Sequence, residues 1–221
     1  MNLTPVQTEA ITARVAQAEA RTGVQIVTAV TDKSHTYPQL PWKAFALAVA
    51  LSGLALVLLD GLRPNWVTAS TALLQIGVLL AAGAATALLV IFVPAIARLF
   101  LRAPRRDLEV RRHAESLFLR HQLFATRERN GVLMLVSLFE HKVEIIADRA
   151  FAGQVTPADW RRVIGPMTSL LQEGRPADAM LAGIQGVEAL LAGKGFRGRA
   201  GATNELPDRP IDTTTDDEAD A

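Results

Sequence analysis

The polar residues best placed to do chemistry follow two predicted strands. Asp32 comes directly after the first strand, and Ser137, Glu140 and His141 lie at the end of the second. Ligands of open α/β sheets gather at the carboxyl ends of parallel strands. Carboxylate and imidazole groups there would hold a divalent cation such as calcium or magnesium, or polarise a phosphate. The plainer alternative is a solvated loop and a hairpin turn that bind nothing.

A second candidate lies at the opposite end of the predicted sheet. Asp148 and Arg149 follow the third predicted strand. Arg149 would bind an anion there. The alternative is a surface ion pair, which contributes less than about 1 kcal/mol to stability.

Composition and spacing exclude several other chemistries. The chain has no cysteine, which excludes disulfides, a thiol nucleophile and cysteine-based metal sites, and suits a reducing compartment. His113 and His121 are eight residues apart, with no His-Glu-x-x-His motif and no cysteine partner, so a zinc site is not predicted. Ser137 has no Gly-x-Ser-x-Gly sequence around it. A net charge of +1 gives no basic field for nucleic acid.

The apolar stretch from Trp42 to Phe100 dominates the chain. Residues 44–59 and 67–97 carry no charge, and a polar turn separates them. A membrane-spanning helix needs roughly 20 mostly apolar residues. We predict a two-helix transmembrane hairpin with spans at about 42–62 and 67–97. A pair of buried core helices is the alternative, but a charge-free run of this length in a 221-residue chain argues against it.

Charged residues around the hairpin predict its orientation. Six arginines follow the second span within a few turns of helix: Arg98, Arg102, Arg105, Arg106, Arg111 and Arg112. The turn between the spans holds only Arg63, beside Asp60. An excess of basic residues marks the cytoplasmic side, so both termini are expected in the cytoplasm. The same arginines form a basic cluster suited to anionic lipid headgroups.

The elements to either side of the hairpin must position the candidate residues. Hydrophobic spacing predicts the order helix, strand, hairpin, helix, strand, strand, helix, helix. The predicted strands are residues 24–30, 132–138 and 142–147. A crossover makes the first two parallel, and a three-residue turn makes the last two antiparallel. The predicted fold class is α/β, with a small mixed sheet in an α/β/α sandwich that the transmembrane hairpin interrupts.

The predicted boundaries follow from this order. Residues 1–40 supply the first helix and strand, residues 41–103 the hairpin, and residues 104–192 the remainder of the α/β domain. Residues 193–221 are rich in Gly and Arg, then in Thr, Asp and Glu, and are predicted to be a disordered tail.

Several segments, in this order and spacing, carry a family resemblance. They are Leu3-Thr4-Pro5 with Gln7, Glu19 to Val27, Asn130 to Leu138, Lys142 to Asp148 and Asn204 to Arg209. With them the chain resembles the TPM domain family, phosphatase-like domains of thylakoid and bacterial membrane proteins. It looks closest to a bacterial branch with a transmembrane hairpin after the first strand. The resemblance implies a Rossmann-like α/β/α sandwich in the bacterial inner (plasma) membrane.

The resemblance implies two kinds of function. Some relatives are associated with phosphatase activity or a divalent ion, others with assembling or maintaining membrane complexes. The glycine run that many members carry after the third strand is replaced here by residues 148–153, and acids are sparse in the next segment. We therefore expect a membrane-anchored, cytoplasm-facing binding or accessory module for a membrane protein complex or lipid bilayer. The alternative is a phosphatase-like hydrolase of phosphomonoesters that uses a divalent cation.

Overall fold

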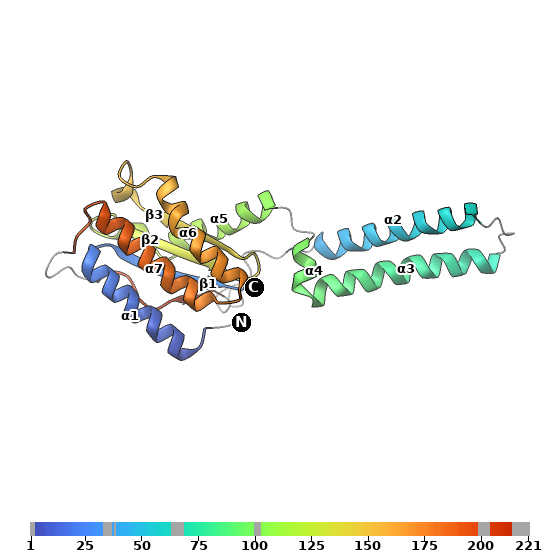
Figure 1. Cartoon of the computed structure of the whole chain (residues 1–221), viewed down its shortest axis with the longest axis horizontal. Coiled ribbons are helices and arrows are strands. Elements are labelled where there is room, and N and C mark those ends of the chain that lie inside the picture. The colour runs from blue at the N-terminus through green and yellow to red at the C-terminus, as the bar shows by residue number, and fades with distance from the viewer. Residues whose placement is uncertain are drawn as a thin grey trace. The chain divides into compact units, whose positions relative to one another are not determined.

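The computed structural model describes residues 3–32, 37, 39–62, 69–99, 103–198 and 204–213. It divides into two compact units (Figure 1). The α/β unit comprises Met1–His35 and Arg106–Ala221, and the hairpin unit comprises Thr36–Arg105. The predicted hairpin boundaries, 41–103, fall close to those of the second unit.

A four-stranded mixed sheet forms the centre of the α/β unit. Its strands are β1 (Gln25–Thr31), β2 (Gly131–Ser137), β3 (Lys142–Ala147) and β4 (Ile211–Asp212), in the order β3-β2-β1-β4. β1 and β2 are parallel, with Thr31 opposite Ser137, and β2 and β3 are antiparallel. Both predicted pairings are confirmed. The long connection through the hairpin allows a parallel crossover, whereas the short β2–β3 turn permits only the antiparallel arrangement.

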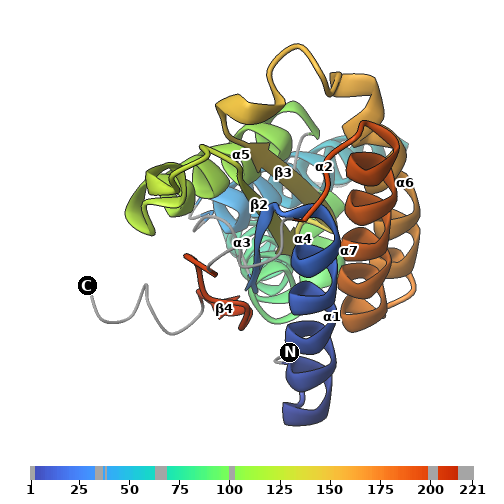
Figure 2. The ribbon, with the colours of Figure 1, turned by 90° about the vertical axis from the view of Figure 1, so that its left-hand side faces the viewer.

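Helices cover both faces of this sheet (Figure 2). α1 (Pro5–Thr22), α6 (Pro157–Gln172) and α7 (Pro176–Gly193) pack on one face, and α5 (Ala103–Arg120) packs on the other. Alternate strand residues divide between the two cores: Ile26 and Met134 contact the α1 side, and Val27 and Leu133 the α5 side. Successive strand side chains point to opposite faces, so two-sided burial requires apolar residues at nearly every position. The predicted α/β/α sandwich is confirmed.

Local signals place the helix that leads into β1. Thr4 caps α1, accepting from the amide of Gln7, and the Gln7 side chain accepts from the amide of Thr4 at 2.9 Å. Gly23 ends the helix with φ 70°, a left-handed conformation that glycine adopts without strain. The chain then enters β1 within two residues.

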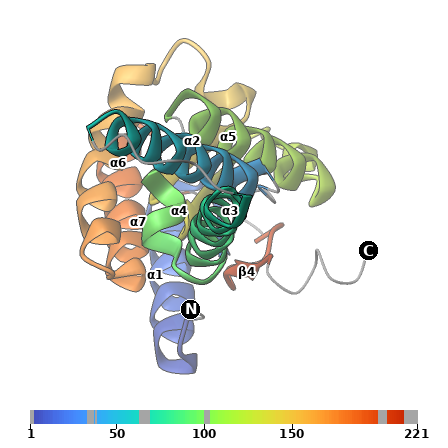
Figure 3. The same cartoon turned by 90° about the vertical axis from the view of Figure 1, so that its right-hand side faces the viewer.

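The hairpin unit contains two long apolar helices. α2 (Gln39–Leu62) and α3 (Ala69–Phe92) lie side by side (Figures 1 and 3). Both are long and apolar enough to cross a membrane, with a mean hydropathy of 2.2. Close packing depends on Gly83, where an added Cβ would lie 2.7 Å from the ring of Phe45.

The second predicted span, 67–97, is longer than the helix observed there. α3 ends at Phe92, and a separate short helix, α4 (Pro94–Leu99), follows Val93. Pro94 lacks an amide hydrogen, and its ring restricts the residue before it, so a helix ends there readily.

The predicted disordered tail is partly wrong. α7 extends to Gly193, and residues 204–213, here called the C-terminal arm, lie along β1 and contain β4. The side-chain oxygen of Gln25 accepts from the amides of Glu205 at 2.7 Å and Leu206 at 3.1 Å. Composition predicted disorder because this segment buries little apolar surface. Hydrogen bonds to β1 order it instead. Residues 199–203 and 214–221 lie outside the described chain.

Candidate functional site

The carboxyl ends of β1 and β2 meet at one edge of the sheet, as parallel strands require. The amide of Leu138 donates to the carbonyl of Thr31 at 3.0 Å, and the amide of Phe139 donates to the carbonyl of Asp32 at 2.9 Å. The backbone of Asp32 therefore lies against the β2–β3 turn, in which Glu140 and His141 also lie. The structure brings the four residues of the first candidate site to one edge.

Two of these residues bond to each other below the surface. The hydroxyl of Ser137 donates to the carboxylate of Glu140, and both side chains are fully buried, with 0% and 1% exposed. His141 closes the turn in a left-handed conformation, φ 49°. Asp32, in contrast, is exposed. The Ser137–Glu140 pair stabilises the turn, because a buried carboxylate needs a hydrogen-bond donor.

Asp148 and Arg149 make different contacts at the opposite edge. The carboxylate of Asp148 caps the short 3₁₀ helix η2 (Arg149–Phe151) by accepting from the amide of Arg149 at 2.7 Å. Its ion-pair partner is Arg129, whose Nε lies 2.8 Å from Oδ2 and whose guanidinium stacks over Phe124. The side chain of Arg149 is exposed. Asp148 thus holds the end of β3 in place, and Arg129 is a partner that sequence reasoning missed.

The basic cluster after the hairpin is only partly described. The side chains of Arg98, Arg102 and Arg105 lie outside the described part of the structure. Arg111 pairs with Glu115 at 2.9 Å and lies 3.7 Å from Glu144 of β3.

A neighbouring ion pair reinforces this helix–strand connection. Lys142 of β3 binds Asp107 of α5 at 2.8 Å. Burial raises the pKa of Glu144, and the charges of Arg111 and Lys142 partly offset that rise. Arg112 is exposed and makes no ion pair with any described residue. Part of the cluster therefore fixes α5 to the sheet, and Arg112 projects into solvent.

Glu19 is a further buried acid, and it was not among the residues singled out from the sequence. Glu19 near the end of α1 is 8% exposed, and its Oε1 accepts from the amide of Ile26 at 2.6 Å. Burial raises its pKa to about 8, and the negative charge of Asp208 in the C-terminal arm adds to the rise. The acid–Gly–strand pattern around Glu19 is a local signal, but Asp208 is distant in sequence.

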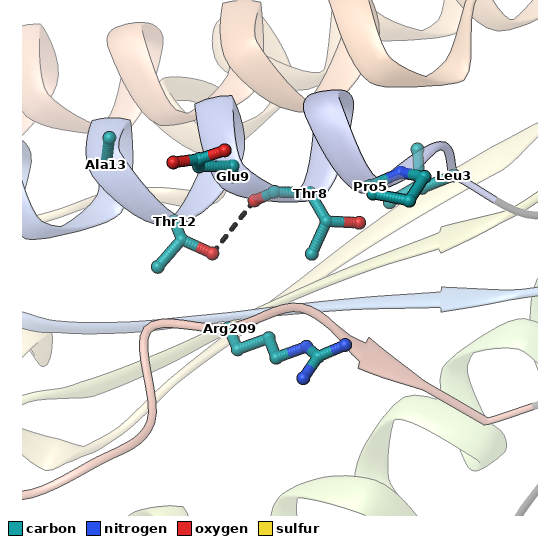
Figure 4. A pocket seen from close by; sticks show the side chains of 7 residues that line it. All are labelled: Leu3, Pro5, Thr8, Glu9, Thr12, Ala13 and Arg209. Carbon is teal, nitrogen blue, oxygen red and sulfur yellow. Dashed lines mark hydrogen bonds between the residues drawn. The ribbon is translucent and has the colours of Figure 1, made fainter.

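A groove of about 530 Å³ separates α1 from the C-terminal arm (Figure 4). Thr8, Glu9 and Thr12 line it from α1, and Arg209 lines it from the arm. The hydroxyl of Thr12 donates a hydrogen bond to the carbonyl of Thr8 at 2.8 Å. The groove is mainly apolar and does not include the residues of either candidate site.

Together these features define an α/β/α domain interrupted by an apolar helical hairpin. A family model for the TPM domain matches residues 79–190, just over half of the chain. The chain therefore belongs to the TPM domain family.

A solved structure supports the fold. The chain is similar to the BA42 protein from the psychrophilic bacterium Bizionia argentinensis, whose NMR structure superimposes with a TM-score of 0.58. The two chains are 15% identical, and the similarity covers 96% of each. At this identity the likeness shows the fold alone. Comparison with curated proteins gives no match.

A divalent cation, which the resemblance implies, does not fit the residues described at the carboxyl edge. Glu140 is buried and holds the hydroxyl of Ser137. Across the described ranges no three His, Asp or Glu side chains converge as metal ligands. A hard cation prefers six or more oxygen ligands, several of them carboxylate. Among the described residues, this edge offers two exposed carboxylates, Asp32 and Asp212, beside a closed turn.

Proposed function

We propose that this chain is a membrane-anchored TPM domain that acts as a cytoplasm-facing binding or accessory module for a partner in the membrane. The observation that carries this proposal is the hairpin. Its apolar side chains point outward: Val57 of α2 is 69% exposed and Leu73 of α3 is 70% exposed. A continuous apolar surface of this size is unstable in water and is matched by lipid.

The distribution of arginines supports an orientation with both termini in the cytoplasm of a bacterial inner membrane. Basic residues collect after the second span, and the turn between the spans holds one arginine. Moving them across a bilayer is unfavourable, so they remain on the side of synthesis. Each basic residue near an anionic surface contributes about 1 kcal/mol, or roughly fivefold in local lipid binding.

Chain length supports a binding surface close to the membrane. β1 ends at Thr31 and α2 begins at Gln39, so at most about 29 Å of extended chain connects them. The exposed side chains at this end of the sheet and of α5, Asp32 and Arg112, are therefore tethered near the bilayer. An embedded protein or a lipid headgroup is a better-placed ligand than a dilute cytosolic metabolite.

Charge reversal tests the role of the basic cluster. We would purify the full chain in nanodiscs that contain phosphatidylglycerol, and measure bound anionic lipid by native mass spectrometry. Arg106→Glu with Arg112→Glu should lower anionic-lipid enrichment at least about fivefold, because two attractions become repulsions. Arg161→Glu, which reverses the charge of an exposed arginine on α6, is the control and should change nothing. Equal enrichment of anionic lipid in all variants, together with unchanged photocrosslinking to membrane proteins, would refute the proposed role as a membrane binding or accessory module.

A phosphatase-like hydrolase is the second candidate, and the contact between Asp32 and the β2–β3 turn favours it. There the backbone of Asp32, whose side chain is exposed, lies against the turn that holds the buried Ser137–Glu140 pair. The test is turnover of a soluble phosphomonoester by the full chain, with and without magnesium or calcium. Turnover that Asp32→Asn abolishes, with lipid and protein crosslinks unchanged, would replace the accessory role with an enzymatic one.

A further inference from the structure

The groove between α1 and the C-terminal arm has one wall formed by a single face of α1. The residues that line it there recur at helical spacing, so their side chains lie on the same side of the helix: Pro5, Thr8, Glu9, Thr12 and Ala13. Leu3 extends this wall just before the helix begins. Most of the lining is apolar, and Glu9 is the charged group that α1 contributes to it.

Arg209 forms the opposite wall, and its side chain lies across from Thr8 and Thr12 in Figure 4. The arm is bound to β1 on both sides of this arginine. Before it, the side chain of Gln25 accepts from an arm amide at 3.1 Å, and after it the carbonyl of Val30 accepts from another at 3.1 Å. Prolines at positions 207 and 210 restrict the backbone between these two bonds. Arg209 is therefore presented on a short, constrained segment.

The two charged groups of the groove are open to a ligand. Glu9 and Arg209 are both exposed, and neither forms an ion pair within the described ranges of the chain. Thr8 adds a hydroxyl to the same lining. The groove thus presents one carboxylate and one guanidinium beside an apolar surface. A ligand that complements all of these carries an anion, a cation and an apolar part.

We propose that this groove binds the headgroup of a zwitterionic phospholipid with a primary ammonium group, of the phosphatidylethanolamine type. The phosphate binds Arg209, whose planar fork of donors matches phosphate oxygens. The ammonium group binds the carboxylate of Glu9, and the glycerol end of the lipid contacts Leu3 and Pro5. A groove of about 530 Å³ is within the size range of ligand pockets, roughly 300–1,000 Å³. The acyl chains remain in the bilayer.

This role rests on the proposed membrane anchoring, which keeps lipid within reach. α1 runs antiparallel to β1, so Leu3 and Pro5 lie toward the carboxyl end of that strand (Figure 4). The chain leaves the same end for α2 through at most about 29 Å of extended connection. Tethering of this kind raises the effective concentration of headgroups. The apolar lining favours a lipid over a small soluble zwitterion, because only a ligand with apolar groups gains from covering it.

Native mass spectrometry of the full chain, released from nanodiscs that contain ethanolamine, choline and glycerol phospholipids, tests the site. The unmodified protein should retain the ethanolamine lipid over the choline lipid, because a quaternary ammonium has no hydrogen to donate to a carboxylate. Glu9→Gln should remove this preference. Arg209→Gln should lower retention of both lipids by up to about fivefold, because they share the phosphate that it binds. Arg161→Gln, at an exposed arginine on α6, is the control and should change neither.

The same experiment separates this site from the membrane module proposed above. Arg106→Glu with Arg112→Glu should lower retention of the anionic glycerol lipid and leave the ethanolamine preference intact. If that variant behaves so while Glu9→Gln keeps the full preference, the groove site is overturned and the module stands. Equal retention of ethanolamine and choline lipids by the unmodified protein would also overturn the site. Complete displacement of the lipid by an equal concentration of soluble glycerophosphoethanolamine would assign the groove to a free metabolite instead.

Discussion

At the scale of single residues, most of the polar side chains near the sheet edges are bound to one another. Glu140 accepts from Ser137, and Asp148 binds Arg129 and the cap of η2. These groups fix turns, because an unpaired buried polar group would cost about 1–3 kcal/mol. The side chains of Asp32 and Arg112 are exposed to solvent.

Gly83 makes the clearest residue-scale prediction within the hairpin. An added Cβ would lie 2.7 Å from the ring of Phe45 and 2.8 Å from Val49, so Gly83→Ile should force α2 and α3 apart. Overpacking of this kind destabilises by roughly 1–3 kcal/mol. Gly77→Ile is the matched control, because nothing lies within 4 Å of its Cβ position. Unfolding in mixed detergent, monitored by circular dichroism, should show a loss of stability for Gly83→Ile and none for Gly77→Ile. Equal stability of the two variants would contradict the packing.

At the scale of elements, β1 holds the α/β unit together across the hairpin. All seven of its residues are buried, and it pairs with β2 on one side and with β4 on the other. α1 also packs against α7 through the ion pairs of Glu188 with Arg14 and Arg21. The segment before the hairpin is therefore an integral part of the sheet and its helical layer.

Removing the hairpin should leave a folded domain. Replacing residues 34–105 with a short Gly/Ser linker keeps every strand, so a soluble protein with one cooperative unfolding transition is expected. Truncation to residues 106–200 removes α1, β1 and β4, and exposes the edge of β2 to aggregation. Size-exclusion chromatography and urea unfolding would compare the two proteins. A monomeric, cooperatively folded truncation would show that β1 is dispensable.

At the scale of the whole molecule, the chain combines an α/β/α domain with a helical pair suited to a bilayer. The domain is formed from both sides of the insertion, so in the proposed topology the chain must return to the side on which it started. Two spans satisfy this requirement. The proposal places that side in the cytoplasm because arginines follow the second predicted span.

Single cysteines test this topology directly, because the chain has none of its own. A cysteine at Asn65, between the spans, should react with an impermeant maleimide added outside intact cells. A cysteine at the exposed Ala152 should react only after the cells are opened. If the cysteine of Ala152→Cys were labelled from outside, the opposite orientation would be correct. If neither cysteine were labelled before lysis, the two helices would not span the membrane. A cysteine at the buried Leu133 is the control for accessibility.

Local pattern was sufficient for most of the fold. The capping residues of α1 and α6, the apolar strands and the charge-free runs each determine their own element, because their signals lie within a few residues. The parallel β1–β2 pair followed from the long connection and the antiparallel β2–β3 pair from the short turn. The end of α3 before Pro94 was a local signal as well, although the predicted span ran past it.

Contacts distant in sequence were decided only by the tertiary structure. Gln25 and Glu205 are 180 residues apart, and nothing in either segment shows that one will accept the other's amide. The arm is polar and cannot order itself by burial, so its strand exists only because β1 offers an unpaired edge. The same reason hid the burial of Glu19 against β1. A carboxyl group acquires a raised pKa from burial, and that burial appears only once the chain has folded around it.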